Sequence, residues 1–359
     1  MQQHLLDAQR IAQDIDDQLR LARASGYLSY AFLKAGNYQR ALETGQLAID
    51  IGDALGNRVL MLEMDFRLGQ VYAALGQYGR ALTLLDRRAQ LGESEALRDP
   101  LSPPFPLSLH AKEWMGYCMA RTGDFAVGIP LLEGTIPLAE ESGQPFALAA
   151  VYYSLCELYV RQGLMDKATP VLERAFALGL AKNLHVYVPG LQSLLGLARC
   201  HAGSIPDGLA LLEESARQWQ KVVSGHGVLL LCNLSEGYLL ADRGADASHA
   251  ATQALELARS RKEQGNEAWA LYMLGEVSGH AACNNVQTAE DHYRRTLALA
   301  NELGMRPLIA HCHFGLFRHY LHMGGPDCTR ENVTTAATMY REMDMQSCLE
   351  KAEAALKKL

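Results

Sequence analysis

Apolar, small and aromatic side chains recur along the chain in a fixed order that ends each time at a glycine. Around Gly76 the order is a leucine and a small residue at Leu68-Gly69, then an aromatic residue at Tyr72, and then the glycine itself. These spacings place the leucine, the small residue and the aromatic ring on adjacent turns of a helix. The small residue lets a second helix approach closely, and the glycine supplies the left-handed conformation that ends a helix. The pattern therefore predicts a helix that ends at each such glycine.

The same order is repeated along almost the whole chain. The turn glycines are separated by 40, 47, 40, 40, 41 and 80 positions and are Gly36, Gly76, Gly123, Gly163, Gly203, Gly244 and Gly324. A second series of residues predicted to end helices lies between them and consists of Gly56, Gly143, Asn183, Gly225, Gly265 and Gly304. A fixed period in this range is typical of stacked repeats, here of two antiparallel helices each. We therefore expect an all-α fold, a right-handed superhelical solenoid of about eight antiparallel helix pairs.

The whole chain, 1–359, is expected to form this single solenoid. The predicted units are 17–56, 57–92, 107–143, 144–183, 184–225, 226–265, 266–304 and 305–344, and a helix over 345–358 is predicted to cap the stack. The stretch 99–106 holds four prolines and is predicted to be a surface loop, because proline is excluded from helix interiors. Asn284-Asn285 stands where a seventh turn glycine is expected, and asparagine tolerates the left-handed conformation. His4–Asp14 is similar to the second helix of an incomplete unit, which suggests a fragment of a longer chain.

Residues 68–81 resemble the tetratricopeptide repeat. The residues that carry the resemblance are Leu68, Gly69, Tyr72, Gly76, Tyr78 and Ala81, and the stretches 155–168 and 195–208 follow the same pattern. The usual tetratricopeptide unit has about 34 residues. The longer unit seen here is similar to the variant in large bacterial signalling ATPases. The resemblance implies a tetratricopeptide-like solenoid whose concave surface binds a partner.

From about Gly225 onward the chain is also similar to the C-terminal repeat region of bacterial adenylate/guanylate cyclase-ATPase fusion proteins. Three stretches carry this similarity, namely 261–271, 302–313 and 337–345. The similarity implies the sensor or scaffold region of such a signalling protein, with an ATPase or cyclase domain as a partner in cis in a longer parent chain. The sequence holds no G-x-x-x-x-G-K-[ST] loop to cradle nucleotide phosphates, so the family's catalysis is not carried over to this chain.

Charge and composition narrow the classes of partner. The net charge is −7 and the pI is about 6.0, so no global basic field favours nucleic acid or an anionic membrane. No apolar run reaches the ~18 residues needed to span a bilayer, and the first residues lack the segments of a signal peptide. We therefore expect a cytoplasmic protein that binds neither nucleic acid nor membrane.

The sequence gives little sign of catalytic or metal chemistry. Its eight cysteines are scattered without a C-x-x-C pair, which favours reduced thiols packed inside helices. On a helix His311 and His313 point about 200° apart, and His319 and His322 alone are too few for zinc, which needs three or four convergent ligands. No spacing indicates a Ser-His-Asp or Cys-His arrangement. We expect no metal, no cofactor and no enzymatic activity.

Basic and aromatic residues share the face that the first helix of each unit is expected to turn toward the concave side. These candidate groove residues are Tyr117, Arg121, Tyr153, Arg161, His201, Tyr238, Tyr272, Arg318 and His322. Arginine forks a carboxylate and tyrosine supplies contact area, so the column predicts a groove for a peptide or partner domain of acidic character. Two alternatives stay open. The residues are the solvated ends of core helices, or the closed superhelix encloses a metabolite and acts as a small-molecule sensor.

Overall fold

The computed structural model describes residues 2–90, 107–219, 227–280, 286–323 and 326–359. Within these ranges the chain forms nineteen α-helices and no β-strand. The helices are α1 (Gln2–Asp14), α2 (Gln18–Lys34), α3 (Tyr38–Ala54), α4 (Arg58–Ala74), α5 (Tyr78–Ala89), α6 (Leu107–Thr122), α7 (Phe125–Glu133), α8 (Ile136–Glu141), α9 (Pro145–Gln162), α10 (Met165–Ala181), α11 (Val188–His201), α12 (Ile205–Trp219), α13 (Gly227–Leu240), α14 (Gly244–Arg261), α15 (Gln264–Gly279), α16 (Val286–Leu303), α17 (Arg306–Met323), α18 (Pro326–Glu342) and α19 (Gln346–Leu356).

Consecutive helices pack as antiparallel pairs, from α2 with α3 to α17 with α18, while α1 packs on α2 and α19 on α18. In the third pair the second helix is split into α7 and α8, because Pro137 at the start of α8 has no N–H to continue the helix. The predicted fold class, an all-α solenoid of about eight helix pairs, is confirmed. None of the described helices is long and apolar enough to cross a bilayer.

The predicted turn glycines place most of the helix ends correctly. Gly36, Gly76, Gly123, Gly163 and Gly203 all adopt the left-handed conformation, with φ between +72° and +90°. The left-handed residues of the second series include Gly56, Gly143, Asn183 and Gly304, as expected. The predictions at Gly225, Asn284-Asn285, Gly324 and the proline-rich loop 99–106 lie outside the described residues.

Two predicted helix ends are wrong. Gly244 is the first residue of α14 rather than the end of α13, and Gly265 lies inside α15. The left-handed residues at these two turns are Asp242 and Lys262, each with φ +58°. A short polar side chain such as that of Asp242 can occupy this conformation as a single residue. The turn therefore comes two or three residues earlier than the nearest glycine.

The small residue of the pattern allows the two helices of a pair to approach closely. A Cβ atom on Gly69 in α4 would lie 2.8 Å from Cδ2 of Leu85 in α5, closer than side chains tolerate. In α13 the small residue is Ser235, whose Oγ donates to the backbone oxygen of Ala247 in α14 at 2.8 Å. Both residues lie seven positions before the left-handed residue of their turn. This equivalence supports Asp242 as the turn residue of the α13–α14 pair.

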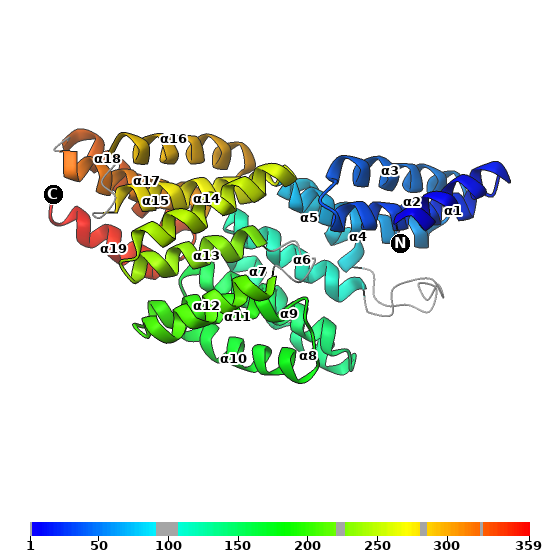
Figure 1. Cartoon of the computed structure of the whole chain (residues 1–359), viewed down its shortest axis with the longest axis horizontal. Helices are drawn as coiled ribbons and strands as arrows, with labels where there is room; N and C mark the ends of the chain where they lie inside the picture. The colour runs from blue at the N-terminus through cyan, green and yellow to red at the C-terminus, as the bar shows by residue number, and fades with distance from the viewer. Residues whose placement is uncertain (1, 91–106, 220–226, 281–285, 324–325) are drawn as a thin grey trace.

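The superhelix turns back on itself, so that its C-terminal half packs against its N-terminal half. In Figure 1, α14 and α15 return to lie beside α5, and α17 contacts α6. The hydroxyl of Tyr38 donates to the Glu263 carboxylate at 2.5 Å, across 225 positions of sequence. Gly76 lies so close to α15 that a Cβ atom there would be 3.1 Å from the amide nitrogen of Gly265.

A second set of contacts ties the end of α9 to the turn before α19. The side-chain amide of Gln162 donates to the backbone oxygens of Met343 and Asp344 at 3.3 and 3.2 Å. A Cβ atom on the next residue, Gly163, would lie 3.5 Å from the Cβ of Ser347. We call the two sets of contacts together the closure. It narrows the open groove expected from the repeats to a cavity that is partly open to solvent.

Candidate functional site

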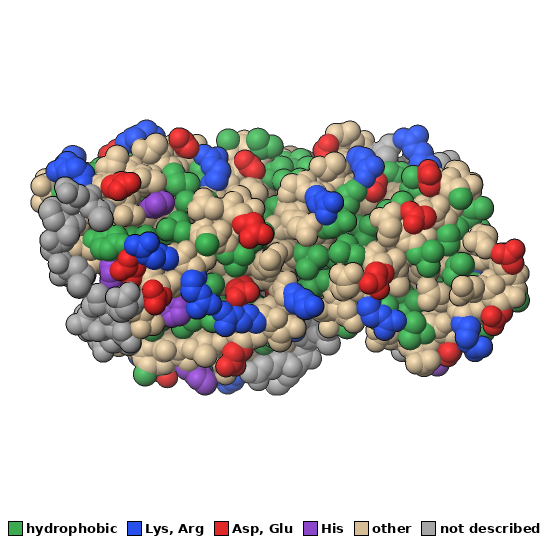
Figure 2. Space-filling model, turned by 90° about the horizontal axis from the view of Figure 1, so that it is seen from above, with side chains coloured by type: hydrophobic (Ala, Val, Ile, Leu, Met, Phe, Trp, Pro, Cys, Tyr) green, Lys and Arg blue, Asp and Glu red, His purple; other side chains and the backbone are tan. Residues whose placement is uncertain are grey.

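The closed superhelix surrounds a cavity of about 1030 Å³ on its concave side. Helices α9, α11, α13, α15 and α17 supply most of its wall, and the first turns of α10 and α19 lie at one end. The charged side chains that line it are basic at Arg161, Lys167, Arg318 and Lys351 and acidic at Asp166, Glu236 and Glu276. In Figure 2 charges of both signs are interspersed on the outer face shown, and histidines gather over the half that holds the C-terminal helices.

Four of the nine predicted groove residues line this cavity, namely Arg161, His201, Tyr272 and Arg318. Three others, Tyr117, Arg121 and Tyr153, are buried in the core. Tyr238 lies outside the cavity wall, and the side chain of His322 is outside the described part of the chain. The predicted groove residues from Arg161 to Arg318 thus lie together around the cavity, except for Tyr238, whereas those before Arg161 are buried.

The covered part of the column is neutralised internally. Arg121 Nη1 lies 2.8 Å from Glu157 Oε1, and each of the two side chains is only 1% exposed. The guanidinium also lies 3.7 Å from the ring centroid of Tyr117. Burial alone would lower the pKa of Arg121, but the Glu157 carboxylate raises it above its usual range. Arg121 therefore stays charged in the core and is not available to a partner in this conformation.

Arg161 continues this network into the cavity wall. Its Nε lies 3.9 Å from Glu157 Oε1, so Arg121 and Arg161 share one carboxylate. Its guanidinium stacks on Trp269 at 4.3 Å from the ring centroid. Arg161 Nε and Trp269 Nε1 are buried, and neither donates a hydrogen bond to any described residue. Arg161 Nη2 donates to Asn233 Oδ1 at 3.5 Å, so the guanidinium is held within the wall by Glu157, Trp269 and Asn233.

His201 and Glu236 form the next polar pair of the wall. His201 Nε2 lies 2.8 Å from Glu236 Oε1. This hydrogen bond raises the pKa of His201, against the effects of burial and of Lys351. Burial would raise the pKa of Glu236, but the hydrogen bond to His201 and the charges of His201 and Arg161 lower it overall. His201 is therefore protonated more readily than a free histidine, and Glu236 is ionised.

Glu276 forms a third polar centre toward the other end. Arg318 Nη2 donates to both of its carboxylate oxygens, at 2.5 and 2.7 Å, and the hydroxyl of Tyr293 donates at 2.7 Å. The Glu276 charge raises the pKa of Arg318, while burial raises that of Tyr272 well above its usual value. Arg318 lines the cavity, but its charge is already paired with the Glu276 carboxylate.

His311 completes the wall between the two carboxylates. Its Nδ1 forms a hydrogen bond with the hydroxyl of Tyr340 at 2.9 Å, and its ring lies 5.9 Å from that of Tyr272. Burial lowers the pKa of His311 from its usual 6.5 to about 4. His311 is therefore neutral near pH 7 and offers the cavity a hydrogen-bonding ring rather than a charge.

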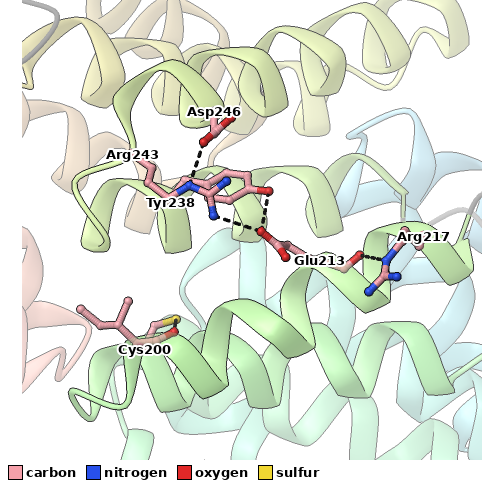
Figure 3. A network of polar contacts seen from close by, with 7 residues as sticks. Cys200, Glu213, Arg217, Tyr238, Arg243 and Asp246 are labelled. Carbon is pink, nitrogen blue, oxygen red and sulfur yellow. Dashed lines mark hydrogen bonds and ion pairs between the residues drawn. The ribbon is translucent and has the colours of Figure 1, made fainter.

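Tyr238 belongs to a different network, which Figure 3 shows between α12, α13 and α14. Its hydroxyl and Arg243 Nη1 both donate to Glu213 Oε1, each at 3.1 Å. Arg243 Nε donates to Asp246 at 2.7 Å, and the guanidinium lies 4.4 Å from the Tyr238 ring. These contacts join adjacent helix pairs and leave Tyr238 no part in the cavity.

The early turn at Asp242 explains this placement. One of the predicted groove positions of a first helix lies six residues before the turn. When the turn is at Asp242, this residue is Glu236, and Tyr238 lies only four residues before the turn. Four before the turn is the packing position that Tyr72 occupies before Gly76. For this reason Glu236 was not among the predicted groove residues, although it lines the cavity. The match between Tyr238 and Tyr72, each four residues before its turn, was the signal that could have placed this turn correctly.

The histidines of α17 are engaged separately. His313 Nδ1 forms a hydrogen bond with Asn332 Oδ1 at 2.8 Å, and His319 Nε2 lies 3.6 Å from Glu290 Oε2. Among the described residues, no group of three or more His, Cys, Asp or Glu side chains could hold a metal ion. Six cysteines are free thiols, namely Cys118, Cys156, Cys200, Cys232, Cys312 and Cys348.

No protein-family model matches this chain, and no curated protein sequence is significantly similar to it. Its fold is similar to several solved structures. A Rap conjugation gene regulator of the plasmid pLS20, in complex with the Phr* peptide, has a TM-score of 0.64 at 13% identity, over 88% of this chain and 94% of that one. A Rap protein complexed with Competence and Sporulation Factor has a TM-score of 0.58 at 11% identity, over 94% and 96%.

A third structure, aspartyl phosphate phosphatase F from Bacillus subtilis, has a TM-score of 0.57 at 15% identity, over 80% of this chain and 73% of that one. At these identities the likeness concerns the fold alone. The chain has a tetratricopeptide-like solenoid fold.

Proposed function

We propose that this chain is a protein-interaction and regulatory module that binds a short peptide in its concave cavity. The observation that carries the proposal is a partly open cavity of about 1030 Å³, walled by helices of five different repeats. Small-ligand sites usually measure ~300–1,000 Å³. This cavity is therefore too small for a folded partner domain and large enough for a segment of a few residues.

The chemistry of the wall supports a peptide. Peptides present amide donors and acceptors along their length together with apolar side chains. The cavity offers paired charges at Glu236 and Glu276, and aromatic or apolar area at Trp269, Tyr272 and Leu239. The Rap conjugation gene regulator, which has a similar fold, is seen in complex with the Phr* peptide. Occupancy would act on the rest of the molecule through the closure, which borders the cavity at Gly163 and Ser347.

We also propose a setting for this module, the sensor or scaffold region of a bacterial cyclase/ATPase-type signalling protein in the cytoplasm. Support comes from the similarity of the three stretches 261–271, 302–313 and 337–345 to the repeat region of those proteins. The test is the full reading frame of the gene. A P-loop ATPase domain in the same frame would support this setting, and a frame that encodes no such domain would reject it.

A metabolite is the second candidate ligand. It is favoured by the closure, which shortens the long open groove expected from the repeats, and by a volume near that of ordinary small-ligand sites. Such a ligand would make the chain a small-molecule sensor. The two candidates differ in ligand size and in the number of polar groups that must be matched.

The test uses a hexapeptide library and a metabolite set, screened by thermal shift and followed by calorimetric titration. Leu240→Trp fills the cavity from a wall residue that is 39% exposed. Leu180→Trp is the matched control, at a residue that is 54% exposed and outside the cavity wall. Peptide binding should weaken about tenfold or more in Leu240→Trp and persist in Leu180→Trp. If only metabolites respond to Leu240→Trp, the sensor function is correct, and if both variants bind equally the cavity is not the site.

A further inference from the structure

Glu236 presents one carboxylate oxygen to the cavity without a partner. Its Oε1 is bonded to His201 Nε2 at 2.8 Å, and its Oε2 accepts no hydrogen bond from any described residue. The side chain lines the cavity and is 32% exposed. Burial would raise the pKa of Glu236, but the hydrogen bond from His201 and nearby positive charges lower it overall. The open oxygen therefore belongs to an ionised carboxylate, which is a strong acceptor.

Arg318 presents an open donor edge to the same cavity. Both of its hydrogen bonds to Glu276 are donated by Nη2, whereas Nε and Nη1 donate to nothing in the described part of the chain. The side chain lines the cavity and is 46% exposed. Arg318 therefore has N–H groups left for a ligand, although its charge is paired with Glu276.

His311 lies between these two groups. Burial lowers its pKa most, while the charge of Glu236 raises it and that of Arg318 lowers it, so both groups are near the ring. The ring of Tyr272, which lines the same cavity, is 5.9 Å away. Nδ1 is bonded to Tyr340, and Nε2 bonds no other residue in the described ranges. His311 thus adds a neutral hydrogen-bonding edge between an open acceptor and an open donor.

The charges around these edges are already balanced, which disfavours a charged ligand group. A cation on Glu236 Oε2 would lie close to Arg161 and His201. An anion on Arg318 would lie beside the Glu276 carboxylate. A neutral group that both donates and accepts hydrogen bonds avoids either repulsion, and its hydrogen bonds to charged partners are stronger than those between neutral groups.

We propose that the cavity recognises an uncharged amide of its ligand, which donates its N–H to Glu236 Oε2 and accepts from Arg318 through its carbonyl oxygen. The ring of Tyr272 offers a flat apolar face beside this group. The amide is a peptide bond or the side-chain carboxamide of an asparagine or glutamine. The inference rests on the proposed function, because it names the group by which the cavity recognises a peptide. It replaces the acidic group that the basic and aromatic column led us to expect.

The first test uses small probes and needs no identified peptide. N-acetylglutamine methylamide is titrated by NMR beside the corresponding derivatives of glutamate and lysine. A carboxamide site should bind the glutamine derivative about tenfold or more tightly than the other two, whereas a peptide-bond site should bind all three equally. In both cases Glu236→Leu should abolish binding. A preference for the glutamate or lysine derivative, binding that survives in Glu236→Leu, or no binding of any derivative overturns the amide site.

Glu267→Leu is the matched control for this test. Glu267 is bonded to Arg259 at 2.8 Å, its side chain is 24% exposed, and it lies outside the cavity wall. Its removal costs one ion pair of similar burial, so binding of the probes should persist. Thermal unfolding followed by circular dichroism shows whether both variants are folded. If Glu236→Leu does not fold, the changes to the ligand described next decide the question in the parent protein.

The second test uses a peptide obtained from the library. Each of its peptide bonds is replaced in turn by an ester, and each asparagine or glutamine by the corresponding acid. One of these changes should weaken binding to the parent about tenfold or more and have little effect in Glu236→Leu. A peptide that binds the cavity and tolerates every change overturns the amide site and leaves the proposed function standing. If no peptide binds but the glutamine derivative does, the proposed function fails and the amide site stands.

Discussion

Arg121 on α6 and Glu157 on α9 form an ion pair of 2.8 Å in which each side chain is 1% exposed. The pair joins two consecutive repeats on the inner face of the superhelix. Tyr117 and Tyr153, both buried, lie close enough to interact with its charges, and Arg161 shares the carboxylate. Two buried charges that satisfy each other cost little as a pair, but either one alone is very unfavourable.

Removal of one partner should therefore be costly. We expect Arg121→Met to lower the free energy of unfolding by about 3–5 kcal/mol, because Glu157 keeps only the more distant Arg161. The double variant Arg121→Met/Glu157→Leu should recover much of this loss. Urea denaturation followed by circular dichroism measures both.

Arg174→Met is the matched control for this prediction. Arg174 pairs with Glu140 at 2.7 Å, but the two side chains are 67% and 42% exposed. An exposed pair contributes about 1 kcal/mol or less. Equal losses in Arg121→Met and Arg174→Met would show that burial of the Arg121–Glu157 pair does not matter.

The glycines within the helices make a second, local prediction. Gly69→Ala should lower the free energy of unfolding by about 1–3 kcal/mol, because the new Cβ would lie 2.8 Å from Leu85. Gly79→Ala, ten positions later in the same helix pair, meets no atom within 4 Å and should be stabilising by about 0.5–1 kcal/mol. The measurement is again urea denaturation. A neutral or stabilising Gly69→Ala would mean that the small position of the repeat has no packing role.

The repeat was predictable because local sequence determines it. Gly163 and Gly203 end their helices where the period places them, since few residues other than glycine adopt the left-handed turn at low cost. The predicted helix ends were wrong at two turns, where Asp242 and Lys262 adopt the left-handed conformation. A glycine two or three residues later, Gly244 or Gly265, was taken for the turn residue instead. The failure displaced Tyr238 into the predicted groove and left Glu236 out of it.

The closure could not be read from the sequence. It depends on small rotations between neighbouring repeats that add up over the length of the solenoid. The contact between Tyr38 and Glu263 joins residues 225 positions apart, and no local pattern marks either of them. Four of the predicted groove residues line the cavity, but Tyr117, Arg121 and Tyr153 are buried in the core. The sequence therefore predicted which helix face points to the inside of the superhelix, but not which residues on that face remain accessible to a ligand.

The closure itself can be tested at two left-handed glycines. Gly76 and Gly56 have φ +83° and +61°, so alanine at either site incurs a left-handed strain of about 1–2 kcal/mol. Only at Gly76 would the new Cβ also press on another repeat, at 3.1 Å from the amide nitrogen of Gly265. We expect Gly76→Ala to cost about 1–3 kcal/mol more than Gly56→Ala in urea denaturation. Equal costs would indicate that the superhelix is open in solution.

The pKa shifts of His311 and His201 predict how the free energy of unfolding depends on pH. The native pKa of His311 is about 4 against a usual 6.5, so the unfolded chain takes up this proton first as the pH falls. His311 therefore contributes stability that is complete above pH 6.5 and is lost as the pH falls toward 4, by up to about 3 kcal/mol. The pKa of His201 is raised by Glu236, so its contribution has the opposite sign and is lost as the pH rises through the native pKa.

His311→Gln should separate these two effects. We expect urea denaturation between pH 7.5 and pH 4.5 to show a smaller loss of stability in His311→Gln than in the parent, because the variant no longer has this proton to bind. His201→Gln should show a larger acid loss than the parent, since the stabilising protonated pair with Glu236 is gone. His185→Gln, at an exposed histidine on the outside, is the control and should follow the parent profile. If His311→Gln loses as much stability as the parent on acidification, the ring is protonated in the native cavity, and Glu236 and Glu276 then hold it as a cation beside the proposed peptide.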